Sequence, residues 1–187
     1  LPESCKAFRL AYLRGSGLFS GRNKRGPTAK LNGPQSEVIT VNIEPLTPAL
    51  GAEIDIDLSQ LTRDGAKSVY DALIRHKVVF FRDQQMTPQQ HIALAEQFGE
   101  IDVPHPVYQN HPDVPAITVL ENDANRPPDT NDWHKDLTFR ESPPFMSILY
   151  AKKVPEAGGD TLWANMALAY DALAVPMREM LDTLEAV

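Results

Sequence analysis

One short segment of the sequence pairs an imidazole with a carboxylate at a spacing that suits metal binding. His134 and Asp136 lie two positions apart within residues 133–139, Trp-His-Lys-Asp-Leu-Thr-Phe. On a β-strand, residues two apart point to the same face, so these two side chains would project together. A neutral imidazole and a carboxylate are two corners of a 2-His-1-carboxylate site, which leaves one face of Fe(II) open. The pair therefore predicts half of a non-haem iron site.

The residues around the pair favour a metal site over an accidental pairing of a histidine with an aspartate. A His-x-Asp triplet is common, and by itself it describes a surface histidine near an aspartate. Here Trp133 and Phe139 flank the pair, and the polar segment 121–132 before it could form the rim of a pocket. A zinc hydrolase that uses an earlier histidine is an alternative, although the spacing matches no known zinc motif.

Periodicity predicts the strands that would position this pair. Alternation of apolar and polar residues is typical of a half-buried strand, and a short β-branched or aromatic run indicates a fully buried one. These patterns predict strands at 38–44, 54–58, 78–81, 117–120, 133–139 and 146–151. Short strands joined by long loops indicate an antiparallel sheet or barrel.

Helical patterns complete an α+β prediction. An apolar stripe predicts a helix over 62–74. Thr87 and Gln90 form a capping box at the start of a second helix over 87–98. His91 falls on the apolar face of that helix, so we expect it to pack against the core rather than bind metal. Two further helices are predicted at 167–173 and 176–184.

Composition excludes several classes of protein. Hydrophobic residues make up 42% and charged residues 23%, which is ordinary for a soluble domain. No apolar run approaches the ~20 residues that a membrane helix needs, so we expect no membrane partner. Cys5 is the single cysteine, which rules out an internal disulfide or a thiolate metal cage and favours a cytoplasmic setting.

Charge is distributed unevenly along the chain. Residues 1–36 hold seven Lys or Arg and one acid, a net +6, and the total of −7 leaves −13 for the remainder. An acidic body argues against nucleic acid as a partner. We expect the basic head, 1–36, to be disordered: a solvated tail or sequence upstream of the true start, with an organelle-targeting segment as the alternative. The folded domain is expected over 37–187.

From about residue 41 to 187 the sequence resembles the N-terminal part of the taurine dioxygenase (TauD/TfdA) family. The resemblance rests on seven segments in the family's order: 73–84, 87–90, 98–100, 105–108, 133–139, 158–163 and 169–173. It implies a double-stranded β-helix core (jelly-roll, cupin-like) with flanking helices, of which this chain carries the first half. Residues 1–36 take no part in the match.

The resemblance assigns roles to individual residues. His134 and Asp136 match the family's iron ligands. Thr161 matches a contact to the cosubstrate 2-oxoglutarate, and its hydroxyl can donate a hydrogen bond to a carboxylate. A further family contact, an asparagine, falls on Thr130, with Asn131 beside it, so either residue is a candidate.

Four more residues match the family's substrate site. His105 and Tyr108 match contacts to the sulfonate group, and both can donate hydrogen bonds to an anion. Leu137 and Phe139 match residues that line the pocket. On a strand Phe139 would share the face of the ligands, whereas Leu137 would point away and contact substrate through its backbone.

The activity implied is an Fe(II)- and 2-oxoglutarate-dependent dioxygenase that uses O₂ to hydroxylate a small sulfonate such as taurine. The products are sulfite, an aldehyde, succinate and CO₂. The same chemistry on an alkylsulfate or carboxylate substrate, or a truncated non-catalytic remnant, are alternatives. The family's second iron histidine and its anion-binding arginines come from later strands, so we expect residues 1–187 alone to bind iron weakly. A homo-oligomer is left open.

Overall fold

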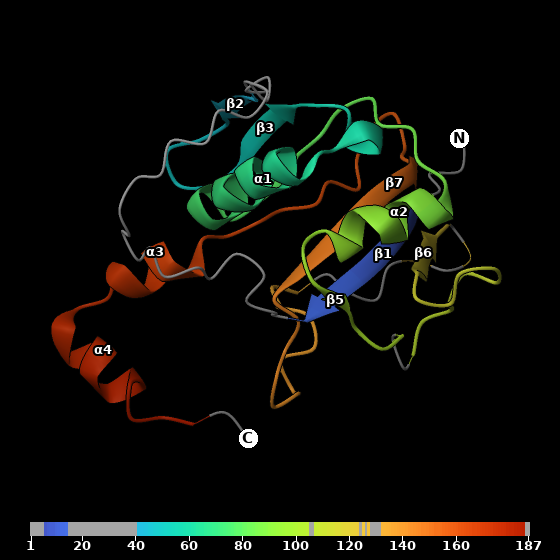
Figure 1. Cartoon of the computed structure of the whole chain (residues 1–187). Helices are drawn as coiled ribbons and strands as arrows, with labels where there is room; N and C mark the ends of the chain where they lie inside the picture. The colour runs from blue at the N-terminus through green and yellow to red at the C-terminus, as the bar shows by residue number, and fades with distance from the viewer. Residues whose placement is uncertain are drawn as a thin grey trace, which may run out of the picture.

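The computed structural model describes residues 41–104, 107–123, 125, 127 and 132–185 in full, and residues 6–14 by their backbone. Two sheets are flanked by helices (Figure 1). This mixed content agrees with the predicted α+β class, whereas the complete double-stranded β-helix stays a prediction. No described helix is long and apolar enough to cross a membrane.

Most of the predicted elements are present with shifted ends. The strands are β1 (Lys6–Arg14), β2 (Asn42–Pro45), β3 (Ala52–Asp55), β4 (Val79–Phe80), β5 (Glu100–Ile101), β6 (Thr118–Asn122) and β7 (Met146–Lys153). The helices are the 3₁₀ turn η1 (Leu58–Gln60), α1 (Arg63–His76), α2 (Pro88–Glu96), α3 (Met166–Asp171) and α4 (Val175–Leu181). The predicted strand at 54–58 ends early, because η1 begins at Leu58 with Asp57 as its cap.

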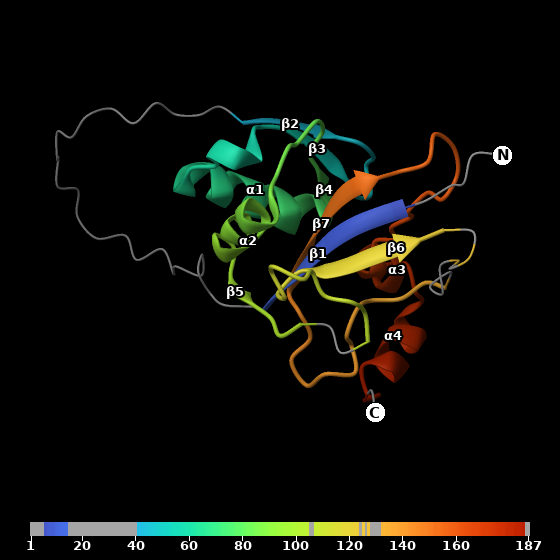
Figure 2. The same cartoon turned by 90° about the vertical axis from the view of Figure 1, so that its right-hand side faces the viewer.

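The larger sheet is organised around β1. This strand pairs antiparallel with β7 along one edge and with β5 and β6 along the other (Figure 2). Leu10, for example, lies opposite Leu149 in β7 and Thr118 in β6. The strand therefore provides backbone hydrogen-bond partners for β7 on one side and for β5 and β6 on the other.

The prediction that the basic head lies outside the fold is wrong for Lys6–Arg14. Phe8, Leu10 and Tyr12 alternate along this segment with the period of a strand, a pattern that the basic composition outweighed in the sequence prediction. The rest of the head, 1–5 and 15–36, lies outside the described residues.

The smaller sheet runs β2-β3-β4. β2 and β3 form an antiparallel pair in which Ile43 lies opposite Ile54, and β4 joins β3 in parallel. Gly51, at φ +91°, turns the chain into β3. Its N–H donates to the carbonyl of His76 at 2.8 Å, which ties the sheet to the end of α1.

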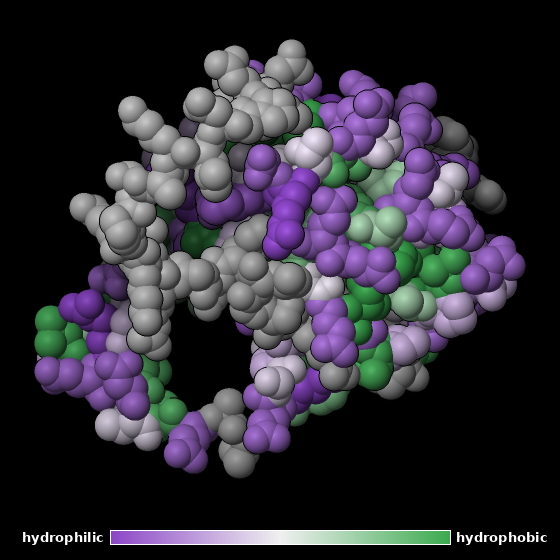
Figure 3. All heavy atoms as spheres, in the orientation of Figure 1, coloured by the Kyte–Doolittle hydropathy of each residue, from purple (hydrophilic) through white to green (hydrophobic). Residues whose placement is uncertain are grey.

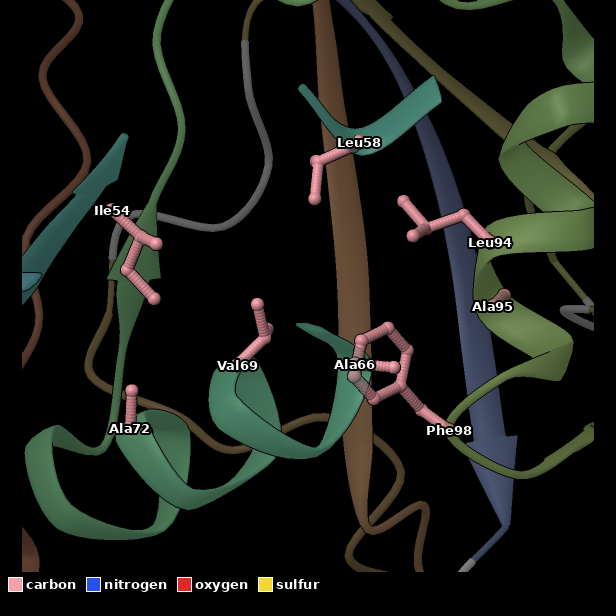
Figure 4. Close-up of a cluster of buried hydrophobic side chains, with 8 residues drawn as sticks. All are labelled: Ile54, Leu58, Ala66, Val69, Ala72, Leu94, Ala95 and Phe98. Carbon is pink, nitrogen blue, oxygen red and sulfur yellow. The ribbon is translucent and has the colours of Figure 1, made fainter. Parts of the chain in front are cut away.

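The main core lies where the two long helices pack against both sheets (Figure 4). Its buried members are Ile54, Leu58, Ala66, Val69, Ala72, Leu94, Ala95 and Phe98. Thr87 and Gln90 form the predicted capping box at the start of α2. His91 is fully buried, with Nε2 3.1 Å from the carbonyl oxygen of Ile148, so the prediction that it packs in the core is confirmed.

The segment 155–185, which we name the C-terminal arm, is packed much more loosely. Neither α3 nor α4 has a buried residue. Figure 3 shows the arm standing off from the body, with apolar side chains on its surface. It is fastened near its start, where Asn165 Nδ2 donates to the carbonyl of Ala49 at 2.7 Å and Trp163 meets the ring of Phe80 edge-on, 5.1 Å between centroids.

Candidate functional site

His134 lies just before a turn that begins at Asp136, and neither residue is on a strand. Residues 136–139 form the turn, Leu137 has φ +55°, and the N–H of Arg140 donates to the carbonyl of Leu137 at 3.2 Å. The predicted strand over 133–139 is therefore wrong. A strand needs a neighbour to pair with its backbone, and in the described part of the chain no strand pairs with this segment.

The turn nevertheless brings the two side chains together. His134 Nε2 and Asp136 Oδ1 are 3.2 Å apart. Two ligands bound at about 2.1 Å and at right angles to one metal ion would be about 3 Å apart. The pair thus has the separation that adjacent ligands of one ion require. The side chains are 52% and 43% exposed, so an ion could reach them from solvent.

The other nitrogen of the His134 ring is held by the backbone. Nδ1 lies 2.8 Å from the carbonyl oxygen of Asp132. A carbonyl can only accept a hydrogen bond, so Nδ1 carries a proton, and Nε2, which faces Asp136, is the nitrogen left to bind a metal ion. Metal-binding histidines are commonly oriented by such a bond. The residues present therefore fit an Fe(II) ion.

Several of the predicted site residues line a cavity of about 1990 Å³. His134, Asp136, Tyr108 and Thr161 all line it, between residues of β6 and β7 and the segment 155–163. A volume of ~300–1,000 Å³ is typical of a small-molecule pocket. This cavity is larger, so it is an open trough and not a closed pocket.

Other predicted residues are not brought to this trough. Leu137 is buried and packs against Leu120, and Phe139 is 78% exposed, and neither lines the cavity. The turn removes the strand periodicity on which their expected orientation depended. His105, Thr130 and Asn131 lie outside the described residues, so their roles stay predictions.

The described residues supply two ligands and not three. Among them, no group of three or more His, Cys, Asp or Glu side chains is placed to hold a metal ion. The site that can be described is thus the His134–Asp136 pair, open to the trough.

Sequence reasoning missed three residues near the site. Trp163 lines the trough and packs on Phe80, and its position within one of the family segments could have indicated it. Asp102 and Arg140 form a buried ion pair beside the turn. They are 38 positions apart, and no local pattern signals a contact over that distance.

Comparison with known proteins supports the resemblance found in the sequence. Residues 42–187 match the family described as "Taurine catabolism dioxygenase TauD, TfdA family". The chain is 38% identical over 156 residues to an alpha-ketoglutarate-dependent sulfate ester dioxygenase of Pseudomonas putida, covering 80% of this chain and 50% of that protein. It is also 38% identical to an alkylsulfatase of Acinetobacter baylyi, covering 82% of this chain and 48% of that protein.

A solved structure extends the likeness to the fold. The crystal structure of a taurine dioxygenase from Burkholderia xenovorans matches with a TM-score of 0.64 and 32% identity, over 76% of this chain and 51% of that one. The chain therefore spans about half the length of the relatives it matches, in agreement with a match to the N-terminal part of the family.

Proposed function

Because the chain belongs to the taurine catabolism dioxygenase TauD, TfdA family, we propose that the complete protein is an Fe(II)- and 2-oxoglutarate-dependent dioxygenase. The observation that carries the proposal is the 3.2 Å separation of His134 Nε2 and Asp136 Oδ1 in the wall of the trough. That separation fits two adjacent ligands of one ion.

Each site residue that the structure describes beside the trough has a role in this proposal. His134 Nε2 and Asp136 hold the iron, and the carbonyl of Asp132 keeps the imidazole turned toward it. When bound, the iron supplies the reaction with O₂ and the oxidation of substrate. Thr161 donates a hydrogen bond to a carboxylate of 2-oxoglutarate, and Tyr108 donates one to the anionic group of the substrate.

We propose a small sulfonate such as taurine as the substrate. One oxygen atom of O₂ hydroxylates the carbon that bears sulfur, the C–S bond breaks, and sulfite leaves with the bonding electrons as an aldehyde forms. The other oxygen atom enters 2-oxoglutarate, which loses CO₂ and becomes succinate. The solved taurine dioxygenase that this chain resembles supports this choice.

A small alkylsulfate is the second candidate. It is favoured by the 38% identity to the sulfate ester dioxygenase and to the alkylsulfatase. Hydroxylation of the carbon attached to the ester oxygen would release sulfate and an aldehyde. The inorganic product therefore separates the two candidates.

The test is a substrate panel with the complete protein, Fe(II) and 2-oxoglutarate. Taurine, a medium-chain alkyl sulfate and an aryloxyalkanoate are supplied separately, and succinate, sulfite and sulfate are measured. We expect succinate together with either sulfite or sulfate. His134→Ala should abolish turnover, whereas the control His76→Ala removes an imidazole that does not line the trough and should leave it unchanged.

Two outcomes would contradict the proposal. Full succinate formation by the His134→Ala variant would show that His134 and Asp136 do not bind the catalytic iron. Turnover of the aryloxyalkanoate alone, with neither sulfite nor sulfate released from the other substrates, would contradict the proposed sulfonate or sulfate substrate. The proposed dioxygenase activity would still stand.

A further inference from the structure

Asp102 and Arg140 form the most deeply buried ion pair that the structure records among the described residues. Arg140 Nη1 lies 2.6 Å from Asp102 Oδ2, and the two side chains are 21% and 3% exposed. The second carboxylate oxygen of Asp102 accepts a hydrogen bond from the backbone N–H of Val103 at 2.8 Å. Both oxygens of the buried carboxylate therefore have a donor, as a buried charge requires.

Each partner of this pair adjoins a segment of the candidate site. Arg140 directly follows the ligand turn, residues 136–139, and its N–H closes that turn onto the carbonyl of Leu137. Asp102 directly follows β5 and lies six positions before Tyr108, which lines the trough. The ion pair thus joins the metal-binding turn to the start of the segment that carries a predicted substrate contact.

The ligand turn needs such an anchor. His134 and Asp136 are about half exposed, so core packing does not fix their positions. A functional site requires its side chains to be held to within about 0.5 Å, and neighbouring contacts must provide that precision. In this turn the buried side chain of Leu137 against Leu120 is one anchor, and Arg140 on Asp102 is the other.

We propose that Asp102 and Arg140 are positioning residues, which hold the ligand turn at a fixed place relative to the segment that leads to Tyr108. Neither side chain lines the trough, so the pair acts through the turn and not by touching substrate. This role rests on the proposed function, because it requires that His134 and Asp136 bind metal. It explains why a charged pair is buried where apolar residues would pack at least as stably.

Co(II), whose visible spectrum depends on coordination, serves as the probe for Fe(II) in the complete protein. Asp102→Asn and Arg140→Met each leave one member of the pair without its charged partner. We expect both to raise the Co(II) dissociation constant about tenfold, the scale typical of contacts that orient metal ligands. Lys67→Met, which breaks the exposed pair with Asp71 on α1, is the matched control and should leave Co(II) affinity unchanged.

A double variant separates positioning from general stability. Asp102→Leu with Arg140→Met removes both charges, so no unpaired charge stays buried, and its unfolding midpoint should return close to that of the unmodified chain. We expect its Co(II) affinity to stay about tenfold weaker, because the directional bond from Arg140 is still missing. Arg140→Lys, which keeps the charge, should recover part of the affinity.

The outcomes are distinguishable. Recovery of both the unfolding midpoint and the Co(II) affinity in the double variant would overturn the positioning role and leave only a structural one. If both single variants keep the Co(II) affinity and His134→Ala loses Co(II) binding, the positioning role of Asp102 and Arg140 is overturned. The metal site at His134 and Asp136 would still stand. Unchanged affinity in His134→Ala itself would overturn the proposed function, and the positioning role with it.

Discussion

Residues 41–101 and residues 132–185 are packed in opposite ways. The first region contains the main core, in which Ile54, Leu94 and Phe98 are at most 4% exposed. In the second region no residue from 151 to 185 is buried, and the exposed apolar side chains include Met166, at 71%. The ligand turn and Thr161 belong to this loosely packed region.

The comparison shows that the residues that stabilise the fold and the residues of the candidate site lie largely in different regions of the chain. The first region can be understood from its own burial, because about 25 cal/mol is gained for each Å² of apolar surface removed from water. The second gains less in this way, and mainly where Met146 and Ile148 of β7 pack against the main core. Its residues instead line a trough and depend on single anchors such as Asn165 and the Asp102–Arg140 pair. Equivalent substitutions in the two regions should therefore have unequal effects.

The largest contrast is expected for core truncation. Phe98→Ala should lower the free energy of unfolding by about 3–5 kcal/mol, because the side chain is 4% exposed and its removal leaves a cavity. Leu181→Ala in α4, where the side chain is 37% exposed, should change it by about 0.5 kcal/mol or less. Urea unfolding followed by circular dichroism measures both. Equal losses would mean that α4 is as tightly packed as α2.

Two glycines with positive φ give the next contrast. Gly51, at +91°, and Gly158, at +78°, would each strain an alanine by about 1–2 kcal/mol. At Gly51 the strain falls on the turn into β3, so Gly51→Ala should lower the unfolding free energy by that amount. At Gly158 the strain falls on the loosely packed segment 155–163, which we expect to unfold separately from the core, so Gly158→Ala should leave the urea midpoint unchanged.

A shift of the midpoint in Gly158→Ala would show that the segment 155–163 unfolds together with the core. In that event the two regions form one cooperative unit, and the difference between them in packing would not be a difference in stability.

Helix caps provide a third and smaller contrast. Thr87→Ala removes the side-chain half of the capping box of α2 and should cost about 1 kcal/mol. Asn165→Ala removes the cap of α3 and the bond to Ala49. It should increase hydrogen exchange in α3 while the midpoint of global unfolding stays the same. Protection unchanged in α3 would mean that other contacts hold this helix.

The smallest effect is expected from pH. Hydrogen bonds from Ser59 to the carboxylate lower the pKa of Asp57 below its usual value. A lowered folded-state pKa contributes stability at pH above about 3.9, and this contribution is lost as the pH falls through the folded-state pKa. Because Asp57 is exposed, the change should be slight. Carboxyl NMR titration should show the lowered pKa, and Ser59→Ala should move it back toward the usual value.

In the C-terminal arm a pKa shift in the opposite direction is found. A hydrogen bond to Asp182 raises the pKa of Tyr170 above its usual value. A raised folded-state pKa contributes stability below about pH 10 that is lost as the pH rises through the folded-state pKa. Ultraviolet titration should place the ionisation of Tyr170 higher in the unmodified chain than in Asp182→Asn. Equal ionisation in both would contradict the link between α3 and α4.

The sequence predicted best what depends on neighbouring residues. Thr87 and Gln90 are three positions apart, and their capping box is present in the structure. His134 and Asp136 are two apart, and their side chains do meet, although a turn at 136–139 and not the expected strand brings them together. Such features depend on backbone geometry over a few residues, which the residue types largely determine.

Features that depend on distant partners were predicted poorly. The segment 133–139 was expected to be a strand, but strand formation requires a neighbouring edge, and the sequence of the segment does not reveal whether one exists. The Asp102–Arg140 pair likewise forms between segments 38 positions apart. The role of β1 was missed in part for the same reason, because its partners β6 and β7 lie more than 100 positions later in the chain.

The placement of β1 has a consequence for biosynthesis. Leu10 pairs with Leu149, 139 positions later in the chain. A ribosome adds roughly 5–20 residues per second, so Leu149 is translated roughly 7–28 seconds after Leu10. Throughout that delay the backbone of β1 can bind any extended strand nearby, including one from a neighbouring nascent chain. Chaperone protection early in translation should therefore matter for this chain.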